Sequence, residues 1–243
     1  QEAEEAQAEL AMAGDTQLSR FRLGVIEDFD ADVTPQLLTD LAGTLTEARF
    51  LLETGASHRL FGLLDERSLD LVISADTGPA PDWAEVHPLL QDPFVAVVPA
   101  SFPDPASRDE LRRLPLIHYT PRHVMGRQIA GHLTEHGMHV TRRVELDSYH
   151  AILAMVAAEA GWSVMTPLAV LRAQRFLADV RVVPLPLPPF SRRISVTARR
   201  GVLQGLPEEI SAKTRSILGD LVVSPSLQRW PWLEGQLSLL PQT

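Results

Sequence analysis

The sequence predicts an α/β protein with two lobes of similar design. Two stretches of the 243-residue chain, about 21–74 and 116–165, each alternate strand and helix patterns in the order β-α-β-α-β. Proline-rich segments, which favour extended chain, occur at 99–105 and 184–189. A last strand and helix, within 194–221, are too small to form a domain of their own. We therefore expect them to return to the first lobe, so that the second lobe is an insertion between two crossing segments.

The first unit opens with a strand at 21–26, whose apolar side chains alternate. Thr34 and Pro35 then have the pattern of a helix N-cap followed by a first-turn proline, and leucines at helical spacing follow them. A strand at 49–53 leads into a helix over 57–64. These patterns predict the first half of a parallel sheet with helices on its faces.

The first unit closes with the apolar run 69–74, which is typical of a strand buried inside a parallel sheet. The second unit repeats the same order of elements. It contains a strand at 116–119, a helix at 125–136, a strand at 140–146, a helix that begins after Asp147-Ser148 and a strand at 162–165.

Composition and charge narrow the class of protein. Hydrophobic residues make up 45% and charged residues 22% of the chain, which is the balance of a soluble globular protein. The acidic start, Gln1 to Glu5, lacks the basic and apolar regions of a secretion signal. With no cysteine, disulfides and thiolate chemistry are excluded, and we expect a cytoplasmic location. A net charge of −9 argues against this chain holding DNA by itself, and we expect the pair Arg192-Arg193 to be a solvated or oligomer contact.

Short motifs follow one another in a recognisable order. They are Leu23-Gly24-Val25, Thr34-Pro35-Gln36-Leu37-Leu38, Leu52-Glu53-Thr54-Gly55, Leu69-Asp70-Leu71-Val72-Ile73, Ala154-Met155-Val156-Ala157-Ala158 and Gly161-Trp162-Ser163-Val164-Met165-Thr166-Pro167. In order and spacing this set resembles the effector-binding domain of LysR-type transcriptional regulators, over nearly the whole stretch from Arg20 to Leu221.

The resemblance implies a two-lobed, periplasmic-binding-protein-like (type 2) fold, in which two Rossmann-like subdomains are joined by two crossover segments. It assigns residues 19–99 plus 190–243 to subdomain I and residues 100–189 to subdomain II. Residues 1–18 would be the end of a linker helix. In the family that helix leads from a winged helix-turn-helix, which this sequence lacks, so we expect a truncated protein.

The resemblance also implies a function and partners. A small-molecule effector would bind in the cleft between the lobes and control DNA binding by the N-terminal helix-turn-helix. The chain would form a homodimer through the regulatory domain, and the full-length protein a homotetramer. DNA would be contacted only through the missing domain, no membrane is expected as a partner, and neither a cofactor nor a metal is expected.

Candidate ligand contacts lie at strand ends and helix starts, which the resemblance places on the cleft. Free N–H groups and the helix dipole make such positions suited to polar ligand groups. The candidates are Asp28, Phe29, Asp30, Thr54, Ser57, His118, Tyr119, Thr120, Ser148, Thr166 and Pro167. Simpler interpretations stay open: Ser57 and Ser148 can act as helix caps alone. Phe29 can be a core residue, and His118 a buried histidine with its hydrogen bonds satisfied.

The loop Glu27–Asp32 departs from the family, because it carries four carboxylates where neutral residues are usual. Like charges around an anionic ligand are costly unless they are compensated. Three interpretations are open. Arg122, His123 or Arg127 neutralises some of the carboxylates across the cleft, or the ligand is neutral or cationic, or the loop is simply solvated.

One pattern typical of enzymes occurs at 132–136, where His-Leu-Thr-Glu-His matches the H-x-x-E-H signature of inverzincin metalloproteases. Two histidines four residues apart lie on one face of a helix, as a metal site requires. Met125, Ile129 and Leu133 are expected to share that face, and no other helix offers an evident third ligand. We therefore interpret the segment as part of the repeated unit and not as a zinc site.

The sequence predicts a sensor and not an enzyme, since it has no Gly-x-Ser-x-Gly elbow, dinucleotide fingerprint or phosphate loop. A solute-binding protein of a transporter would share the architecture, but the acidic, helical N-terminus without a signal sequence counts against it. An enzyme on this fold, such as a dehydratase, is disfavoured by the lack of cysteine and of a paired acid/base motif.

Overall fold

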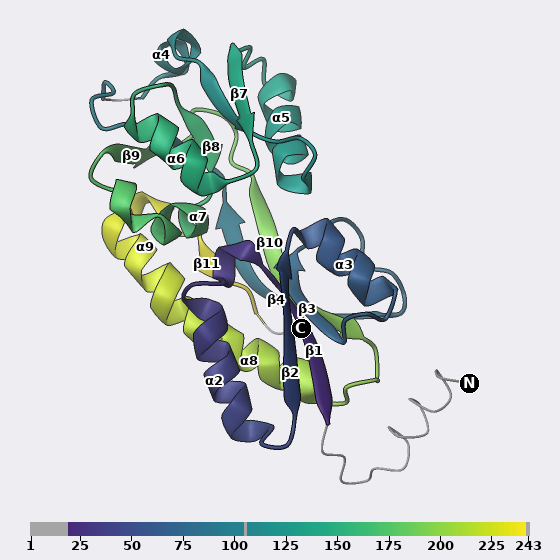
Figure 1. Ribbon diagram of the computed structural model, residues 1–243. Coiled ribbons are helices and arrows are strands. Elements are labelled where there is room, and N and C mark those ends of the chain that lie inside the picture. The colour runs from purple at the N-terminus through teal and green to yellow at the C-terminus, as the bar shows by residue number, and fades with distance from the viewer. Residues whose placement is uncertain (1–18, 105, 242–243) are drawn as a thin grey trace.

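The computed structural model describes residues 19–104 and 106–241, and the expected linker helix over 1–18 lies outside them. Two α/β lobes lie end to end and are joined by two crossings of the chain (Figure 1). The predicted fold class is confirmed.

The first lobe contains a six-stranded sheet with the order β11-β4-β10-β3-β1-β2. Its strands are β1 (Arg20–Ile26), β2 (Arg49–Gly55), β3 (Leu71–Ala75), β4 (Ala84–Pro93), β10 (Ser191–Arg199) and β11 (Ser238–Leu239). β1 pairs in parallel with both β2 and β3, as the first β-α-β-α-β unit predicts. β10 then pairs antiparallel with β3 and β4, which confirms that the late strand returns to the first lobe.

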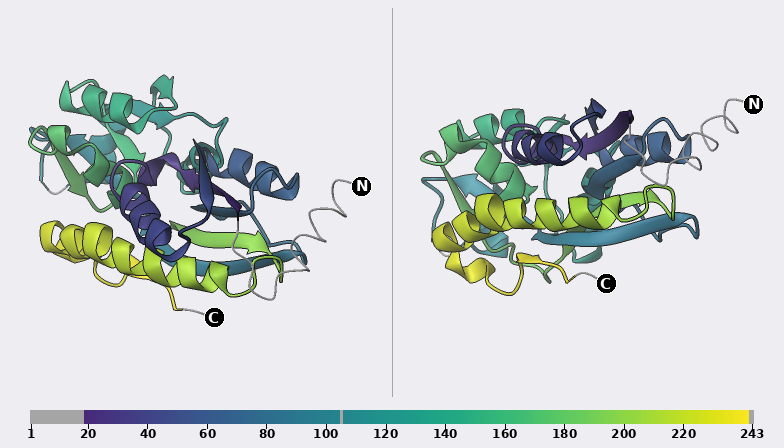
Figure 2. Two further views of the ribbon diagram at one scale, coloured as in Figure 1. Left: turned by 60° about the horizontal axis from the view of Figure 1, so that its bottom comes forward. Right: turned by 90° about the horizontal axis from the view of Figure 1, so that it is seen from below.

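Helices cover both faces of this sheet. They are α2 (Val33–Thr44), α3 (Ser57–Asp65) and α8 (Leu206–Leu218). α2 and α8 pack together on one face, and α3 packs on β1, β2 and β3 from the other (Figure 2). The predicted N-cap of α2 is wrong: Asp32 precedes the helix, and Thr34 lies buried in its first turn.

The second lobe repeats the arrangement with a smaller sheet. Its strands are β5 (Val95–Pro99), β6 (Leu116–Tyr119), β7 (Arg142–Leu146), β8 (Ser163–Met165) and β9 (Val180–Val183), and its helices α4 (Arg108–Arg113), α5 (Val124–Glu135), α6 (Tyr149–Ala157) and α7 (Pro167–Arg172). β6 pairs in parallel with β7, and β5 lies between β8 and β9. A parallel bridge between Leu116 and Trp162 links the two groups of strands.

The crossings lie at Phe94, between β4 and β5, and at 184–190, between β9 and β10. The Phe94 and Phe190 rings stack with their centroids 4.4 Å apart, and the Phe94 amide donates to the Phe190 carbonyl at 3.0 Å. The predicted end of the first segment at residue 99 is therefore wrong, because β5 belongs to the second lobe. β4 was not predicted from the sequence, because it contains prolines, which are rare inside strands.

The C-terminal tail reaches from the first lobe to the second. After α8 come η3 (Gly219–Val223), α9 (Ser224–Arg229) and η4 (Pro231–Leu233), before β11 pairs with β4. Arg229 donates to the carbonyl of Leu177, which follows η2 (Gln174–Phe176), and Trp230 is buried. The tail therefore supports the contact between the lobes.

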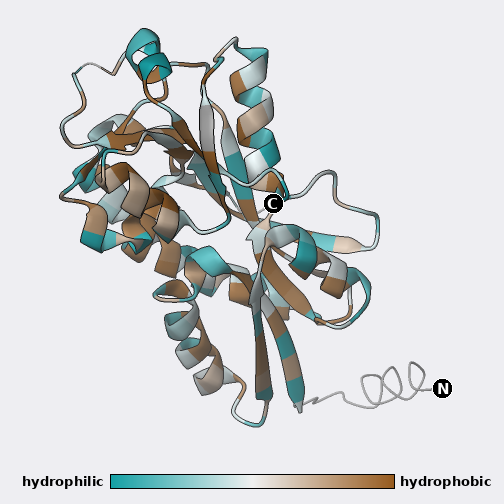
Figure 3. Cartoon of the chain, turned by 45° about the horizontal axis from the view of Figure 1, so that its top comes forward, coloured by the Kyte–Doolittle hydropathy of each residue, from teal (hydrophilic) through white to brown (hydrophobic). Residues whose placement is uncertain are grey.

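Apolar side chains concentrate on the strands and on the inner faces of the helices, as the brown segments of Figure 3 show. Among the described residues, the largest side chains that are fully buried are Trp162 in the second lobe and Phe21 and Phe29 in the first. Within the residues described, no helix is long and apolar enough to cross a bilayer.

Candidate functional site

A cleft with a cavity volume of about 60 Å³ lies between the lobes and opens to solvent. The first lobe contributes the ends of β1, β2 and β3, the first turn of α3 and β10, and the second contributes the end of β6 and the starts of α5 and α6. The lining residues are Ile26, Glu27, Asp28, Gly55, Ala56, Ser57, His58, Ala75, Asp76, Tyr119, His123, Val124, Met125, Gln128, Tyr149 and Arg192.

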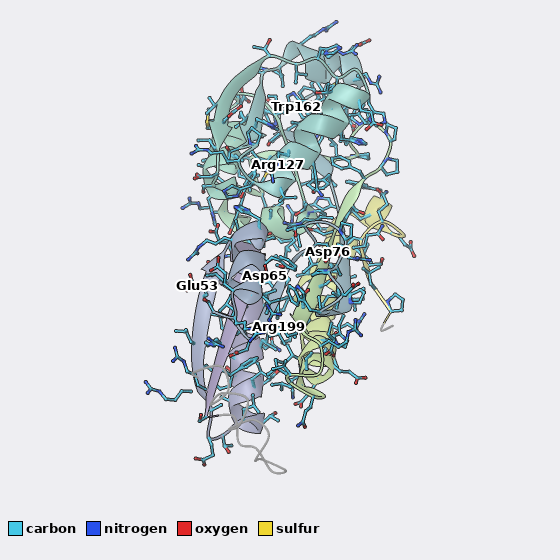
Figure 4. All side chains as sticks on the ribbon, turned by 90° about the vertical axis from the view of Figure 1, so that its right-hand side faces the viewer. Glu53, Asp65, Asp76, Arg127, Trp162 and Arg199 are labelled. Carbon is cyan, nitrogen blue, oxygen red and sulfur yellow. The ribbon has the colours of Figure 1, made fainter. Side chains whose placement is uncertain are left out.

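The parallel strands explain why these residues meet. Ile26 and Gly55 are register partners at the ends of β1 and β2, and β3 ends beside them at Ala75. Carboxyl ends of parallel strands gather at one edge of a sheet, which is where open α/β sheets bind ligands. Figure 4 places Asp76 at the edge of the first lobe that faces the second, and Arg127 on the second lobe beyond it.

A buried ion triad forms the floor of the cleft. Arg192 on β10 donates to Asp28 at 2.6 Å and to Asp92 at 2.9 Å, and the side chain of Arg192 is 7% exposed. Burial by itself would lower the pKa of Arg192, but the two carboxylates outweigh it and the pKa is raised. Complete burial raises the pKa of Asp92, and the neighbouring guanidinium opposes that rise.

The same guanidinium touches the second lobe. Arg192 donates to Thr166 Oγ1 at 3.2 Å, and its Nη1 lies 3.6 Å from Met125 Sδ. Both partners belong to the second lobe. Arg192 therefore links the cleft floor to both lobes at the place where the chain has just crossed between them.

A second arginine spans the cleft edge from the other side. Arg172, at the end of α7 in the second lobe, donates to the carbonyl of Glu27 and to the carboxylate of Asp30. The Glu27 and Asp30 groups belong to η1 (Glu27–Phe29) and the residue after it. The side chain of Arg172 is 8% exposed and that of Asp30 is 48% exposed, so the pair lies at the boundary with solvent.

Two of the four carboxylates of the acidic loop are thus paired, though not with the predicted partners. Arg192 and Arg172 pair with Asp28 and Asp30. Arg122 and Arg127 hydrogen-bond within their own segment, to the Thr120 hydroxyl and to nearby carbonyls. Their predicted role, and that of His123, in neutralising the loop is therefore wrong.

Ser57 lines the cleft but does not cap α3, whose N-cap position is Ala56. The Ser57 hydroxyl instead accepts a hydrogen bond of 3.1 Å from the Ala75 amide, which ties α3 to the end of β3. A hydroxyl that accepts in this way keeps its own hydrogen for a further partner. Ser57 can therefore donate to a molecule in the cleft.

Two tyrosines of the second lobe, Tyr119 and Tyr149, line the cleft. Burial raises the pKa of Tyr119, and it raises the pKa of Tyr149 to about 12, so both side chains are uncharged hydrogen-bonding groups at neutral pH. Tyr119 Oη lies 3.4 Å from His123 Nδ1.

Two histidines face each other across the cleft. His58 belongs to α3 and His123 precedes α5, and their ring centroids are 5.7 Å apart. Burial, His123 and Arg127 together lower the pKa of His58. This contact between the lobes is therefore sensitive to protonation.

Three of the eleven predicted ligand residues line the cleft: Asp28, Ser57 and Tyr119. The others lie elsewhere. Phe29, His118, Thr120, Thr166 and Pro167 are buried in the lobes, Thr54 is half-buried beside the cleft, and Asp30 and Ser148 are exposed outside it. Side chains alternate along a strand, which explains why Tyr119 reaches the cleft while its neighbours on either side do not.

Two of the non-lining residues cap helices. Ser148 accepts from the Ala151 amide at 3.4 Å, as predicted, and Thr166 accepts from the Ala169 amide at 3.4 Å. Arg192, His58 and Gln128 line the cleft although none of them was predicted there, and the expectation that Arg192 is a solvated or oligomer contact is wrong, because its side chain is buried. Arg192 had no local signal, because its partner Asp28 lies 164 residues earlier in the chain.

The profile of the LysR substrate binding domain matches residues 14–206. No curated protein matches the sequence.

Solved structures share the fold. The reduced regulatory domain of OxyR2 from Vibrio vulnificus is 18% identical, with a TM-score of 0.68 over 84% of this chain and 98% of that one. A reduced form of OxyR from N. meningitidis is 23% identical, with a TM-score of 0.66 over 91% and 99%. A full-length OxyR variant from Pseudomonas aeruginosa is 23% identical, with a TM-score of 0.68 over 88% and 75%.

Proposed function

Because the chain belongs to the family of LysR substrate-binding domains, we propose that it senses a small effector for a LysR-type transcriptional regulator. The observation that carries the proposal is the interlobe cleft, whose polar groups come from both lobes. Ser57 and Asp28 approach from one side, and Tyr119 and Gln128 from the other. A molecule that touches both walls has different contacts in an open and in a closed arrangement.

Such a difference is what a sensor requires. A ligand shifts an equilibrium between two arrangements only by its difference in affinity for them. The contacts of Arg172 and Arg192 across the lobes hold the arrangement described here. An effector that strengthens or replaces these contacts would change the spacing of DNA-binding domains attached to the chain.

The charges of the lining favour an uncharged or cationic effector. Three carboxylates, Glu27, Asp28 and Asp76, line the cleft together with one guanidinium, Arg192, while Asp76 is paired with Arg193 outside the lining. The Arg192 guanidinium is already shared between Asp28 and Asp92. An anionic ligand would have to displace one of these carboxylates, and leaving a buried carboxylate unpaired is costly.

The remaining parts of the proposal rest on the family. DNA would be bound by a helix-turn-helix domain outside this chain, and the protein would act in the cytoplasm. The regulatory domains would form a homodimer, and the complete regulator a homotetramer. The chain would bind its effector without transforming it.

A thermal-shift screen tests the proposal. Small metabolites should be screened in matched amine, alcohol and carboxylate forms, since a ligand at 100 times its Kd stabilises the native state by about 2.7 kcal/mol. We expect amines or alcohols to raise the unfolding temperature and carboxylates not to. Gln128→Ala, an exposed lining residue, should weaken the response, and Gln174→Ala, outside the cleft, should leave it unchanged.

Three results would overturn this proposal. One is chemical turnover of the stabilising molecule by the purified chain. Another is equal stabilisation of the Gln128→Ala variant and the wild type at every ligand concentration. The third is a full-length protein whose binding to its DNA site does not change when the molecule is added.

A further inference from the structure

Three potential metal ligands lie together at the end of α5, away from the cleft. One donor atom from each of His132, Glu135 and His136 lies within 4.8 Å of the other two. The two imidazole rings have their centroids 4.2 Å apart. Glu135 is exposed and both histidines are half-buried, so the group is open to solvent on one side.

Backbone carbonyls fix the proton positions of both histidines. A nitrogen of His132, Nε2, lies 2.8 Å from the carbonyl of Pro188, and Nδ1 of His136 lies 2.9 Å from the carbonyl of His132. A carbonyl oxygen only accepts, so each of these nitrogens carries the hydrogen. In the neutral ring, the lone pairs then lie on His132 Nδ1 and on His136 Nε2.

This is the arrangement in which proteins prepare histidine for a metal. A ligating imidazole usually donates its other N–H to a carbonyl or carboxylate, which fixes its tautomer and orientation. The bond from His132 to Pro188 also ties α5 to the second crossing of the chain.

The sequence argued against a metal site because apolar residues were expected on the same helix face as the histidines and because no second helix offered a third ligand. The structure answers both points. Ile129 and Leu133 point into the core, with exposures of 1% and 2%, and Met125 lines the cleft. The two histidines lie on a neighbouring, half-buried stripe, so they do not share the apolar face. The third ligand, Glu135, comes from the same helix, which is why a search for a second helix missed it.

We propose that His132, Glu135 and His136 bind a divalent transition metal of the zinc class. Two imidazoles and a carboxylate are the ligands that such ions take, and they leave a fourth position for water. Arg108 and Arg112 lie near the end of α5, but they bond to the carbonyls of His136 and Gly137. The three ligands come from the last turn of α5 and the residue that follows it, and the site does not depend on the function proposed for the cleft.

A bound metal would stabilise the region in which the chain crosses between the two lobes. The His132 ring stacks on Phe190 with the centroids 3.8 Å apart, and Phe190 stacks in turn on Phe94. The three rings therefore connect α5 to both crossings. A metal bound to His132 would hold this stack in place.

Titration with Zn²⁺ alone, followed by calorimetry, tests the site on a chain without a polyhistidine tag. We expect one ion per chain and a loss of affinity of at least about tenfold in His136→Ala and in Glu135→Gln. His139→Ala is the matched control, because His139 is an exposed histidine three residues beyond the group. Titration with Co²⁺ should give the visible absorption of a four- or five-coordinate ion.

Unfolding of each variant without metal separates loss of a ligand from loss of the fold. The proposal is overturned if Zn²⁺ fails to bind to the wild type. It is also overturned if His136→Ala and Glu135→Gln, both folded, bind as tightly as His139→Ala. A failure to bind Zn²⁺ would not count against the proposed effector binding, because the effector screen tests Gln128 in the cleft and not the last turn of α5.

Discussion

Arg192 Nη2 lies 2.6 Å from Asp28 Oδ2, although 164 residues separate the two in the chain. The bond joins the strand that has just re-entered the first lobe to the loop that borders the cleft. Asp92, on the neighbouring strand, shares the same guanidinium and is fully buried. In the floor of the cleft, both carboxylates are therefore paired with a single guanidinium before any ligand binds.

Replacing Arg192 by leucine should destabilise the fold severely. The change leaves two carboxylates unpaired, one of them fully buried, and breaking a buried pair by removing one partner costs about 3–5 kcal/mol. Arg193→Leu is the matched control, since Arg193 is 55% exposed and its bond to Asp76 is a surface pair worth at most about 1 kcal/mol. Urea unfolding of both variants measures the difference. Equal losses would show that the triad contributes no more than a surface ion pair.

Much of the fold was predictable because it depends on local patterns. The alternating apolar residues of β1 and the continuous apolar run of β3 predict a parallel sheet, and the structure confirms it. β4 was missed because Pro88 and Pro93 interrupt its pattern. Pro88 is tolerated because β4 bulges next to it: Ile194 pairs with Leu90 and Ser195 with Pro88, which leaves Leu89 as an extra residue in β4.

The cleft was predictable in place and only partly in its residues. The ends of β1, β2 and β6 could be located from the sequence, but the direction of each side chain depends on pleat and register. A shift of one residue separates Tyr119, which lines the cleft, from His118, which is 1% exposed. Contacts between distant segments, such as that of Arg172 with Asp30, leave no local pattern at all.

Arg172→Ala should loosen the contact between the lobes. The change removes the bonds to the Glu27 carbonyl and to Asp30, and we expect a loss of about 1–2 kcal/mol, since charged hydrogen bonds at a partly exposed site are worth about that much. Hydrogen exchange should rise at η1 and α7 while it stays constant in β3. Arg175→Ala is the control, because Arg175 is exposed and its guanidinium lies over the ring of its neighbour Phe176. An unchanged exchange pattern in Arg172→Ala would contradict the prediction.

Acidification should destabilise the protein below pH 6.5. Burial lowers the pKa of His58, and of His132 and His150, so the unfolded chain binds more protons than the folded chain in the range between the folded values and 6.5. Stability therefore falls as the pH falls through that range. His58→Asn should reduce the slope of unfolding free energy against pH without abolishing it, because the other two histidines retain their share. A slope identical to that of the wild type would show that protonation of His58 does not contribute to the pH dependence of stability.

Two glycines of α5 should respond in opposite ways to alanine. A Cβ on Gly126 would lie 2.1 Å from the carbonyl oxygen of Thr120 and 2.6 Å from that of Tyr119, and these are backbone atoms that cannot rotate away. We expect Gly126→Ala to lose about 1–3 kcal/mol and to displace Tyr119 from the cleft wall. Gly131 lies on the same helix with nothing within 4 Å of its added Cβ, so Gly131→Ala should gain about 0.5–1 kcal/mol. Urea unfolding gives both values, and a stable Gly126→Ala would mean that α5 can move away from β6, as an opening cleft would require.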